Sequence, residues 1–280
     1  MKRKHEAGWY VAQVVKYAVL IFLIVVVIYP IVWMFMGSIK LEKEILRFPP
    51  TFFGSKYTFK NYKRVFTEIP MLQYLKNTVI FAGVTTVGAV LFDSMAGYAF
   101  ARLRFRHKNL IFILVLLTMM VPFQVVMIPM FLESRYLGLL DTYAGLILPK
   151  ITSAFGIFMM RSYFAELPKE LEEAARVDGC SEMGIFFKIM LPLVKPGMLT
   201  LAIFHLMNNW NDLLYPLMMT SDSKMRTLSA GLALFVGEHG TLHYGSQLAG
   251  AVITILPLLV LYIFFQKYFV SSAVSSGVKG

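Results

Sequence analysis

The chain has 280 residues, of which 58% are hydrophobic and 15% charged, whereas soluble domains have about 45–50% apolar and about 25% charged residues. This composition excludes an ordinary soluble protein and indicates that much of the apolar surface faces lipid. The formal net charge is +11, but the basic residues are scattered between long apolar runs, so nucleic-acid binding is not expected. The single cysteine, Cys180, excludes an intrachain disulfide and a cysteine-based metal cluster.

Charge-poor stretches that are long enough to cross about 30 Å of hydrocarbon predict six transmembrane helices. The first lies between Lys16 and Lys40 and lacks the small-residue cleavage site of a signal peptide. The second contains Asp93, and the fourth contains Pro149 and Lys150, which predict a kink with the lysine near an aqueous end. The predicted spans are residues 17–39, 77–101, 109–132, 142–164, 196–220 and 244–266. The expected fold is an all-α membrane protein with a single transmembrane domain over residues 1–280.

The basic residues predict the direction of these spans. The short loop 102–108 holds Arg102, Arg104, Arg106 and Lys108, a density typical of a cytoplasmic loop. Six spans then place both termini in the cytoplasm. The segment 40–76 carries eight basic residues and faces outward in this topology, but long loops weigh less than short ones. We therefore expect the segment 165–195 in the cytoplasm, and the segments 40–76, 133–141 and 221–243 outside.

The segment 165–195 holds six of the sixteen acidic residues of the chain. Its early carboxylates favour a helix that starts near Pro168, and Gly179 can supply the left-handed residue that ends this helix. A second short helix is predicted over residues 181–190, before Pro192. Each helix has an apolar stripe, formed by Leu171, Ala174 and Ala175 on the first and by Phe186, Ile189 and Met190 on the second. These stripes have little of the segment itself to pack against, which leaves docking on a partner and folding back on the membrane both open.

The residues of this segment match a known motif. Glu173-Ala174-Ala175, then Gly179, then Ile189-Met190-Leu191-Pro192 resemble the EAA loop of ABC importer permeases. Over residues 21–280, further stretches are similar to binding-protein-dependent ABC sugar importer permeases of the MalG type, namely Gly-Leu-Leu-Asp-Thr-Tyr at 138–143, Ala-Phe-Gly-Ile-Phe at 154–158, Leu-Pro-Lys-Glu-Leu at 167–171, Trp-Asn-Asp at 210–212 and Val-Lys-Gly at 278–280. Cys180 and Asp93 depart from the family pattern, which has alanine and a neutral residue there.

The resemblance implies a type I permease fold in the bacterial plasma membrane and ATP-driven import of an oligosaccharide. The implied partners are a second permease of the MalF type, two ABC ATPase subunits and an extracytoplasmic sugar-binding protein. In the family, the EAA loop seats in a cleft on the ATPase. The residues that match this role are Glu173, Ala174, Ala175, Asp178, Gly179, Phe186, Ile189, Leu191 and Pro192. The outer residues that correspond to a binding-protein contact are Gly237, Glu238, His239, Gly240 and Tyr244.

The motifs of catalysis and cofactor binding are absent from the sequence. No phosphate-binding loop G-x-x-x-x-G-K-[ST] and no G-x-S-x-G nucleophile motif occurs, so we expect no enzymatic activity, no cofactor in this chain, and ATP and magnesium on the partner ATPases. His239 and His243 beside Glu238 have a spacing that could hold a metal on a helix. The glycines at 237 and 240 favour a loop instead, and no metal site is expected.

Polar residues inside the fifth predicted span need an explanation, because a carboxylate in a membrane is costly. Asn208, Asn209, Trp210, Asn211 and Asp212 could line a polar path for a hydroxyl-rich solute. Hydrogen bonding between helices of the bundle is an equally open reading, and in maltose-type importers the sugar site lies mainly on the companion permease.

Two other functions remain open from the residues alone. A proton-coupled secondary transporter could use Asp93, Asp212 or His205 as a relay, and a membrane-embedded metalloenzyme could use His239 and His243. For Asp93, we expect pairing with a neighbouring helix rather than proton transfer.

Overall fold

The structure is a computed structural model that describes residues 2–238 and 243–277, with side chains described over 8–235 and 243–264 and at 266. All regular elements in these ranges are helices, and the only β-type pairing there is one isolated bridge between Lys40 and Tyr57. The all-α prediction is therefore confirmed. Residues 1–69 with 235–256 form one compact unit, and residues 70–234 with 257–280 form another. The single domain over residues 1–280 stays a prediction.

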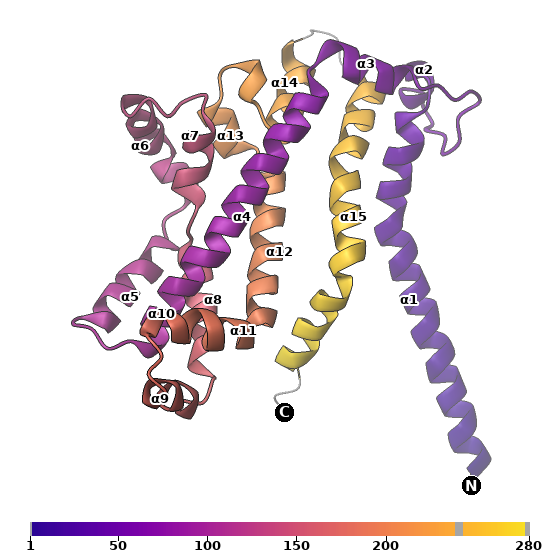
Figure 1. Ribbon diagram of the computed structural model, residues 1–280. Helices are drawn as coiled ribbons and strands as arrows, with labels where there is room; N and C mark the ends of the chain where they lie inside the picture. Colours follow the sequence, from indigo (N-terminus) through magenta and orange to yellow (C-terminus); the bar gives the residue numbers. More distant parts are fainter. Residues whose placement is uncertain (1, 239–242, 278–280) are drawn as a thin grey trace. The chain divides into compact units, whose positions relative to one another are not determined.

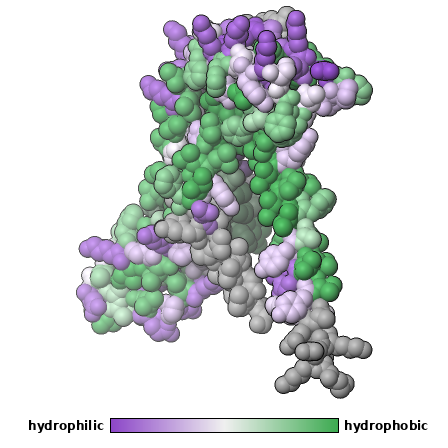
Figure 2. Space-filling view, turned by 90° about the vertical axis from the view of Figure 1, so that its right-hand side faces the viewer, coloured by the Kyte–Doolittle hydropathy of each residue, from purple (hydrophilic) through white to green (hydrophobic). Residues whose placement is uncertain are grey.

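The first unit contains α1 (Lys2–Ser38), α2 (Glu42–Ile45), α3 (Lys60–Glu68) and the beginning of α15 (Tyr244–Gly277) (Figure 1). Every large apolar side chain of α1 from Trp9 to Tyr29 is at least 42% exposed. A helix that is apolar all round and exposed in this way must face lipid or another chain. Figure 2 shows that apolar residues, in green, cover much of the face turned to the viewer.

The second unit is built around one long helix, α4 (Met71–Arg102), which packs against α8 (Ala154–Ala165) and α12 (Lys195–Asn211) (Figure 1). The remaining elements in chain order are α5 (Lys108–Thr118), α6 (Phe123–Tyr136), α7 (Tyr143–Ile147), η1 (Leu148–Lys150), α9 (Glu170–Val177), α10 (Glu182–Gly184), η2 (Ile185–Met190), α11 (Leu191–Leu193), α13 (Leu214–Met219), η3 (Ser223–Met225), most of α14 (Leu228–Glu238) and the end of α15.

Three of the predicted spans correspond to continuous helices that are long and apolar enough to cross a membrane, in α1, α4 and α15. The other candidates are bent pairs of helices. α5 and α6 meet at 97°, α7 with η1 meets α8 at 45°, and the helical run 182–193 meets α12 at 80°. The kink expected at Pro149 and Lys150 is confirmed. The described residues therefore give six spans if each bent pair crosses the membrane once.

Two predicted spans are wrong in their continuity, and proline explains both breaks. The span predicted over 109–132 stops at Thr118 and resumes at Phe123, because Pro122 has extended backbone and no amide hydrogen to donate. The span predicted over 196–220 stops at Asn211, and Asp212 is extended. In a continuous helix the ring of Pro216 would collide with the carbonyl of residue 212, four positions earlier. The chain instead starts a new helix, α13.

The segment 165–195 forms two helical pieces joined by a tight turn. Gly179 has a φ of +79°, and the amide of Cys180 donates to the carbonyl of Ala175 at 2.9 Å, which is the hydrogen bond of a Schellman turn. The predicted left-handed glycine is confirmed. The helix predicted to end before Pro192 instead continues to Leu193, because residues 185–190 form a π-helix. The wider π turn moves the carbonyl that a proline ring would otherwise hit.

The apolar stripe of the second piece is buried within this chain. Phe186 and Met190 are at most 2% exposed and pack with Tyr98, Met160 and Phe164. The expectation that the stripes have little of their own chain to pack against is therefore wrong for this stripe, and also for Ala175 of the first stripe, which lies in the same buried cluster. The cause is that α4 and α8 extend to the same end of the unit and supply the missing apolar surface.

A glycine sets the closest approach between α4 and α8. A Cβ atom added at Gly97 would lie 2.7 Å from the backbone nitrogen of Arg161 and 2.7 Å from the Cβ of Met160. Backbone atoms cannot move away cheaply, so only glycine fits where these two helices cross. Gly83, on the same helix, has no atom within 4 Å of an added Cβ.

We predict that Gly97→Val destabilises the protein by about 1–3 kcal/mol or more, because the added methyl groups force α4 and α8 apart. The measurement is the midpoint of thermal unfolding of the purified chain in detergent. Gly83→Val is the matched control and should stay near the wild-type midpoint. Equal midpoints for the two variants would contradict the close crossing.

Candidate functional site

The first helix of the segment 165–195 has a buried side and an exposed side. Glu172 and Ala175 are 4% exposed and point into the unit. Glu173 and Ala174 lie on the exposed side, next to Val177, which is 88% exposed. Further apolar side chains are exposed nearby at Leu171, Met183 and Phe187. The segment thus presents an uncovered apolar surface while its opposite side is held by its own chain. We call the exposed residues Leu171, Glu173, Ala174, Val177, Met183 and Phe187 the coupling surface.

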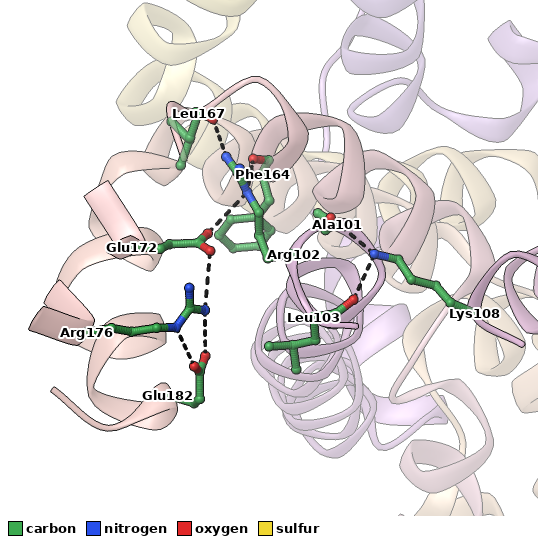
Figure 3. Close-up of polar contacts among 9 residues, drawn as sticks. All are labelled: Ala101, Arg102, Leu103, Lys108, Phe164, Leu167, Glu172, Arg176 and Glu182. Carbon is green, nitrogen blue, oxygen red and sulfur yellow. Dashed lines mark hydrogen bonds and ion pairs between the residues drawn. The ribbon is translucent and has the colours of Figure 1, made fainter. Parts of the chain in front are cut away.

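Arg102, the last residue of α4, ties this segment to the helices behind it (Figure 3). Its Nε donates to the carbonyl of Phe164 at 3.0 Å, and its Nη2 donates to the carbonyl of Leu167. The same Nε lies 3.2 Å from Oε1 of Glu172. Both side chains of this ion pair are nearly buried, with 5% and 6% exposure. A guanidinium can satisfy several acceptors at once, which lysine cannot do in the same geometry.

The ion pair continues along the segment. Arg176 lies 3.6 Å from Oε2 of Glu172 and donates to Oε1 of Glu182 at 2.7 Å, and Figure 3 shows the chain of contacts from Arg102 to Glu182. Burial raises the pKa of the Glu172 carboxyl, and the nearby charges of Arg102 and Arg176 oppose this rise. Beside these groups is a polar hollow of about 490 Å³. The charged network therefore joins α4, α9 and α10.

Sequence reasoning missed most of this network. The spacing of Glu172 and Arg176, four residues apart, could have indicated an ion pair on a helix. No local pattern could have paired Arg102 with the carbonyl of Phe164, which is sixty-two residues away.

A second feature of the same unit is an open cavity of about 920 Å³. Residues beside three interruptions of the helices line it: Phe123 at the start of α6, Pro149, Lys150, Thr152 and Ser153 around the kink before α8, and Asn211 to Leu213 between α12 and α13. Irregular backbone inside a membrane is tolerated where it is buried in protein or lines a water-filled cavity. The cavity therefore provides the polar surroundings that the backbone at these breaks needs.

Amide side chains from α12 line this cavity. Asn208 and Asn211 each donate to a carbonyl four residues earlier in their own helix. Asn209 is only 3% exposed, and its Nδ2 has no hydrogen-bond partner among the described residues. Trp210, which the sequence placed on the same path, is 4% exposed and is not among the residues that line the cavity. An unpaired buried amide is costly, and the amides that are exposed at the cavity are those of Asn208 and Asn211.

The charged residues near the cavity are paired. Lys150 donates to Oδ2 of Asp212, while Oδ1 of Asp212 accepts from the amide of Tyr215 at 3.3 Å and so caps α13. The ammonium of Lys150 also lies 5.0 Å from the centre of the Tyr215 ring. Pairing between helices is therefore present at Asp212, and the same residue also lines the cavity.

Asp93 is fully buried and holds the beginning of α8. Its carboxylate accepts from Thr152 Oγ1 at 2.6 Å, and from the backbone amide and Oγ of Ser153 at 2.9 and 3.0 Å. His205 Nε2 lies 3.1 Å from Ser153 Oγ and 3.4 Å from Asp93 Oδ2. The predicted pairing of Asp93 with a neighbouring helix is confirmed.

The predicted outer contact lies only partly in the described residues. His239 and Gly240 lie outside them, and Gly237 and Glu238 are described only as the end of α14. Tyr244 is 39% exposed, and its amide donates to Oε1 of Glu42 at 2.7 Å. The amide of Gly245 donates to the other oxygen of Glu42 at 3.0 Å. The carboxylate of Glu42 thus caps the positive end of α15.

In the residues that the structure describes, no group of three or more His, Cys, Asp and Glu side chains could hold a metal ion. The metal site suggested by His239 and His243 includes His239, which lies outside the described residues.

Comparison with known proteins decides the family. Residues 93–273 match the family model described as binding-protein-dependent transport system inner membrane component. The chain belongs to this family. It is a multi-pass membrane protein of the permease type, and this membership argues against both the proton-coupled secondary transporter and the metalloenzyme.

Individual relatives agree with the family over almost the whole chain. The arabinooligosaccharides transport system permease protein AraQ of Halalkalibacterium halodurans is 40% identical and covers 92% of this chain and 94% of its own length. The trehalose/maltose transport system permease protein MalG of Thermococcus litoralis is 35% identical, with 93% and 94% covered. A crystal structure of a bacterial ABC transporter involved in the import of the acidic polysaccharide alginate contains a chain that is 26% identical, with a TM-score of 0.80 and 92% and 96% covered. The resemblance to sugar importer permeases and the ABC importer permease fold are confirmed.

We predict that Arg102→Ala loosens the segment 165–195. The variant leaves the buried carboxylate of Glu172 without its main partner, which costs roughly 3 kcal/mol or more. Limited trypsin digestion in detergent should then cleave the segment several-fold faster than in the wild type. Arg104→Ala, at an exposed arginine two residues away, is the control and should leave the rate unchanged.

The pH dependence of this variant has a definite sign. Burial already raises the pKa of Glu172, and removal of Arg102 raises it further. A carboxyl with a raised pKa in the closed segment binds its proton more tightly there than in the open one, so the closed segment is favoured at low pH and is lost as the pH rises. Trypsin itself is slower in acid because its catalytic histidine is protonated, so each rate is compared with that of Arg104→Ala at the same pH. Relative to this control, cleavage of Arg102→Ala should be slower at about pH 5.5 than at about pH 8. Addition of Glu172→Gln should remove this difference; if it persists, Glu172 is not its source.

Proposed function

We propose that this chain is one permease subunit of an ATP-driven, binding-protein-dependent importer of an oligosaccharide. The sugar-transport relatives, which are 35% and 40% identical over more than nine tenths of the chain, support a carbohydrate substrate. ATP hydrolysis, with its magnesium, takes place on separate ATPase subunits, because the sequence has no phosphate-binding loop. A second permease of the MalF type and an extracytoplasmic sugar-binding protein complete the transporter. This chain contains no cofactor of its own.

The observation that carries the coupling role is the two-sided character of the segment 165–195. Its inner side is fixed to α4 and α8 by the ion pair of Arg102 with Glu172 and by the apolar packing of Phe186. Its outer side is the coupling surface, which is apolar and uncovered. A rigid element with an exposed apolar face of this kind fits a cleft on another protein. We place this surface in the cytoplasm, against the ATPase.

The remaining residues of the proposed contact help to fix the fold of the segment and are not part of the coupling surface. Gly179 forms the turn between the two helical pieces. The others are Ala175, Asp178, Ile189, Leu191 and Pro192, of which Ala175 is buried. ATP-driven closure of the ATPase dimer would move this segment, and the contacts of Arg102 would pass the movement to α4.

The cavity of the second unit serves as this chain's part of the sugar path. Asn208, Asn211 and Asp212 line it, and Trp210 supports it from a buried position. Sugars present hydroxyl groups at their edges and apolar C–H groups on their faces, which suits amides placed beside aromatic rings. At the other proposed contact, Tyr244 with Gly237, Glu238, His239 and Gly240 meets the binding protein on the outer side.

We predict that Ala174→Trp abolishes the coupling function without preventing membrane insertion. Ala174 is exposed, and an indole there would block close approach of an ATPase cleft. The measurement is copurification of the ATPase subunits with the permease pair, and ATP hydrolysis stimulated by the sugar-loaded binding protein in nanodiscs. Ala165→Trp, at an exposed alanine that ends α8, is the control and should assemble normally. If Ala174→Trp behaves like Ala165→Trp, the coupling surface is not the ATPase contact.

A second variant tests the turn. Gly179→Val strains a left-handed backbone by about one or more kcal/mol and should tilt the second helical piece. In Gly179→Val, stimulated ATP hydrolysis should fall. Glu173→Lys should weaken assembly through charge repulsion in a basic cleft.

The native thiol of Cys180 gives a direct readout of the contact. It is exposed in the free chain and should lose reactivity with a maleimide when the ATPase binds. An unchanged reactivity in the assembled complex would place the contact elsewhere.

We also predict that a photo-crosslinking amino acid at Tyr244 captures the sugar-binding protein in a transporter trapped in the outward-facing state. The same amino acid at Tyr136, which is 90% exposed, is the comparison position. Mass spectrometry identifies the captured chain. Efficient capture from position 136 with none from position 244 would contradict the assignment of the outer contact.

A further inference from the structure

One lysine, Lys150, lines the cavity, and its positive charge is neutralised by an ion pair. Among the lining residues in the described part of the chain, the fully charged groups are Lys150 and Asp212, and these two form an ion pair. Their side chains are 30% and 16% exposed, so the pair faces the cavity rather than bulk solvent. Together they contribute no net charge to its wall.

The position of Lys150 is fixed by more than this carboxylate. Its ammonium lies 5.0 Å from the ring centre of Tyr215 and 6.0 Å from that of Phe81. Asp212 in turn is held because its Oδ1 accepts from the amide of Tyr215. The pair joins the kink before α8 to the break between α12 and α13, and it cannot swing away from the cavity without losing these contacts.

Among the described lining residues, no further ammonium or guanidinium group is present. Of the other titratable lining residues, Tyr215 donates its hydroxyl to the carbonyl of Gly145, and His205 has Nε2 within 3.1 Å of Ser153 Oγ. Ser153 Oγ donates to Asp93 and accepts from the amide of Gly156. Because the serine hydroxyl has one proton, which goes to Asp93, it must accept from His205, so Nε2 carries the hydrogen. His205 therefore directs this N–H group to the protein and not to a ligand in the cavity.

We propose that the Lys150–Asp212 pair makes this cavity select uncharged saccharides and reject acidic ones. A carboxylated sugar would have to compete with Asp212 for the only ammonium, and it would bring a second carboxylate beside the first. A neutral sugar meets no such penalty and can use the exposed amides of Asn208 and Asn211 and the aromatic rings. This inference rests on the proposed role of the cavity as part of the sugar path.

The test is direct binding of two probes to the assembled transporter in nanodiscs without the binding protein. The probes are a neutral arabinose trisaccharide and a galacturonic acid trisaccharide of similar size, measured by equilibrium dialysis. The wild type should bind the neutral probe more tightly. Asp212→Asn keeps the Oδ1 acceptor that caps α13 but frees the charge of Lys150. It should therefore improve binding of the acidic probe relative to the neutral one by about tenfold or more, the scale of a charge-assisted hydrogen bond.

The double variant Lys150→Met with Asp212→Asn restores a neutral wall and should restore the wild-type preference. Binding of the neutral probe by this variant shows that the cavity is still folded. The control is Asp222→Asn, at an exposed carboxylate outside the cavity lining, which should bind both probes like the wild type. If Asp212→Asn leaves the ratio of the two affinities unchanged while Asn208→Leu weakens the neutral probe, charge selection is wrong and the cavity remains a sugar site. If the wild type binds neither probe, both the inference and the proposed path are wrong.

Discussion

The close crossing of α4 and α8 is the constraint on which the rest of the second unit depends. Gly97 removes the side chain that would separate the two backbones. Asp93, four residues before it on α4, binds the beginning of α8, and Arg102, five residues after it, binds carbonyls at the end of α8 and just beyond. The two helices are thus joined at the start, the middle and the end of α8. Each joint uses a different kind of contact: a carboxylate on amide and hydroxyl groups, backbone against backbone, and a guanidinium on carbonyls.

The paired helices α4 and α8 connect the cavity with the segment 165–195, for which we propose different roles. At one end, Ser153 and His205 belong both to the joint with Asp93 and to the lining of the cavity. At the other end, Arg102 reaches Glu172 in the segment that carries the coupling surface. A displacement of that segment would therefore be passed to α8 and to the cavity wall through polar contacts and packed side chains. Rigid helices and packed side chains can carry such coupling, and the paired helices provide both.

Much of this arrangement could be predicted from the sequence, because the relevant signals are local. The apolar stretches indicated the long helices, and Gly179 indicated the turn. Of the motif Glu173-Ala174-Ala175, the first two residues are exposed and Ala175 is buried, and its role in coupling stays a prediction. The break at Asp212 was also within reach, since Pro216 stands four residues later, but the apolar character of residues 196–220 favoured a continuous span. The burial of Phe186 and the partners of Arg102 could not be predicted, because they depend on residues far away in the sequence that only the tertiary structure brings together.

The aromatic residues of α1 have a consequence for the membrane in which the protein can work. Trp9 packs edge to face on Tyr10 near one end of this helix, and Trp33 lies within 5.9 Å of Tyr29 and Phe52 near the other end. Aromatic rings of this kind settle at the headgroup level of a bilayer. Trp33 follows Trp9 by 24 positions, which correspond to about 36 Å of helix, a little more than the hydrocarbon thickness of about 30 Å. A thinner bilayer would therefore be met by a tilt of α1, and a thicker one would pull one aromatic group out of its layer.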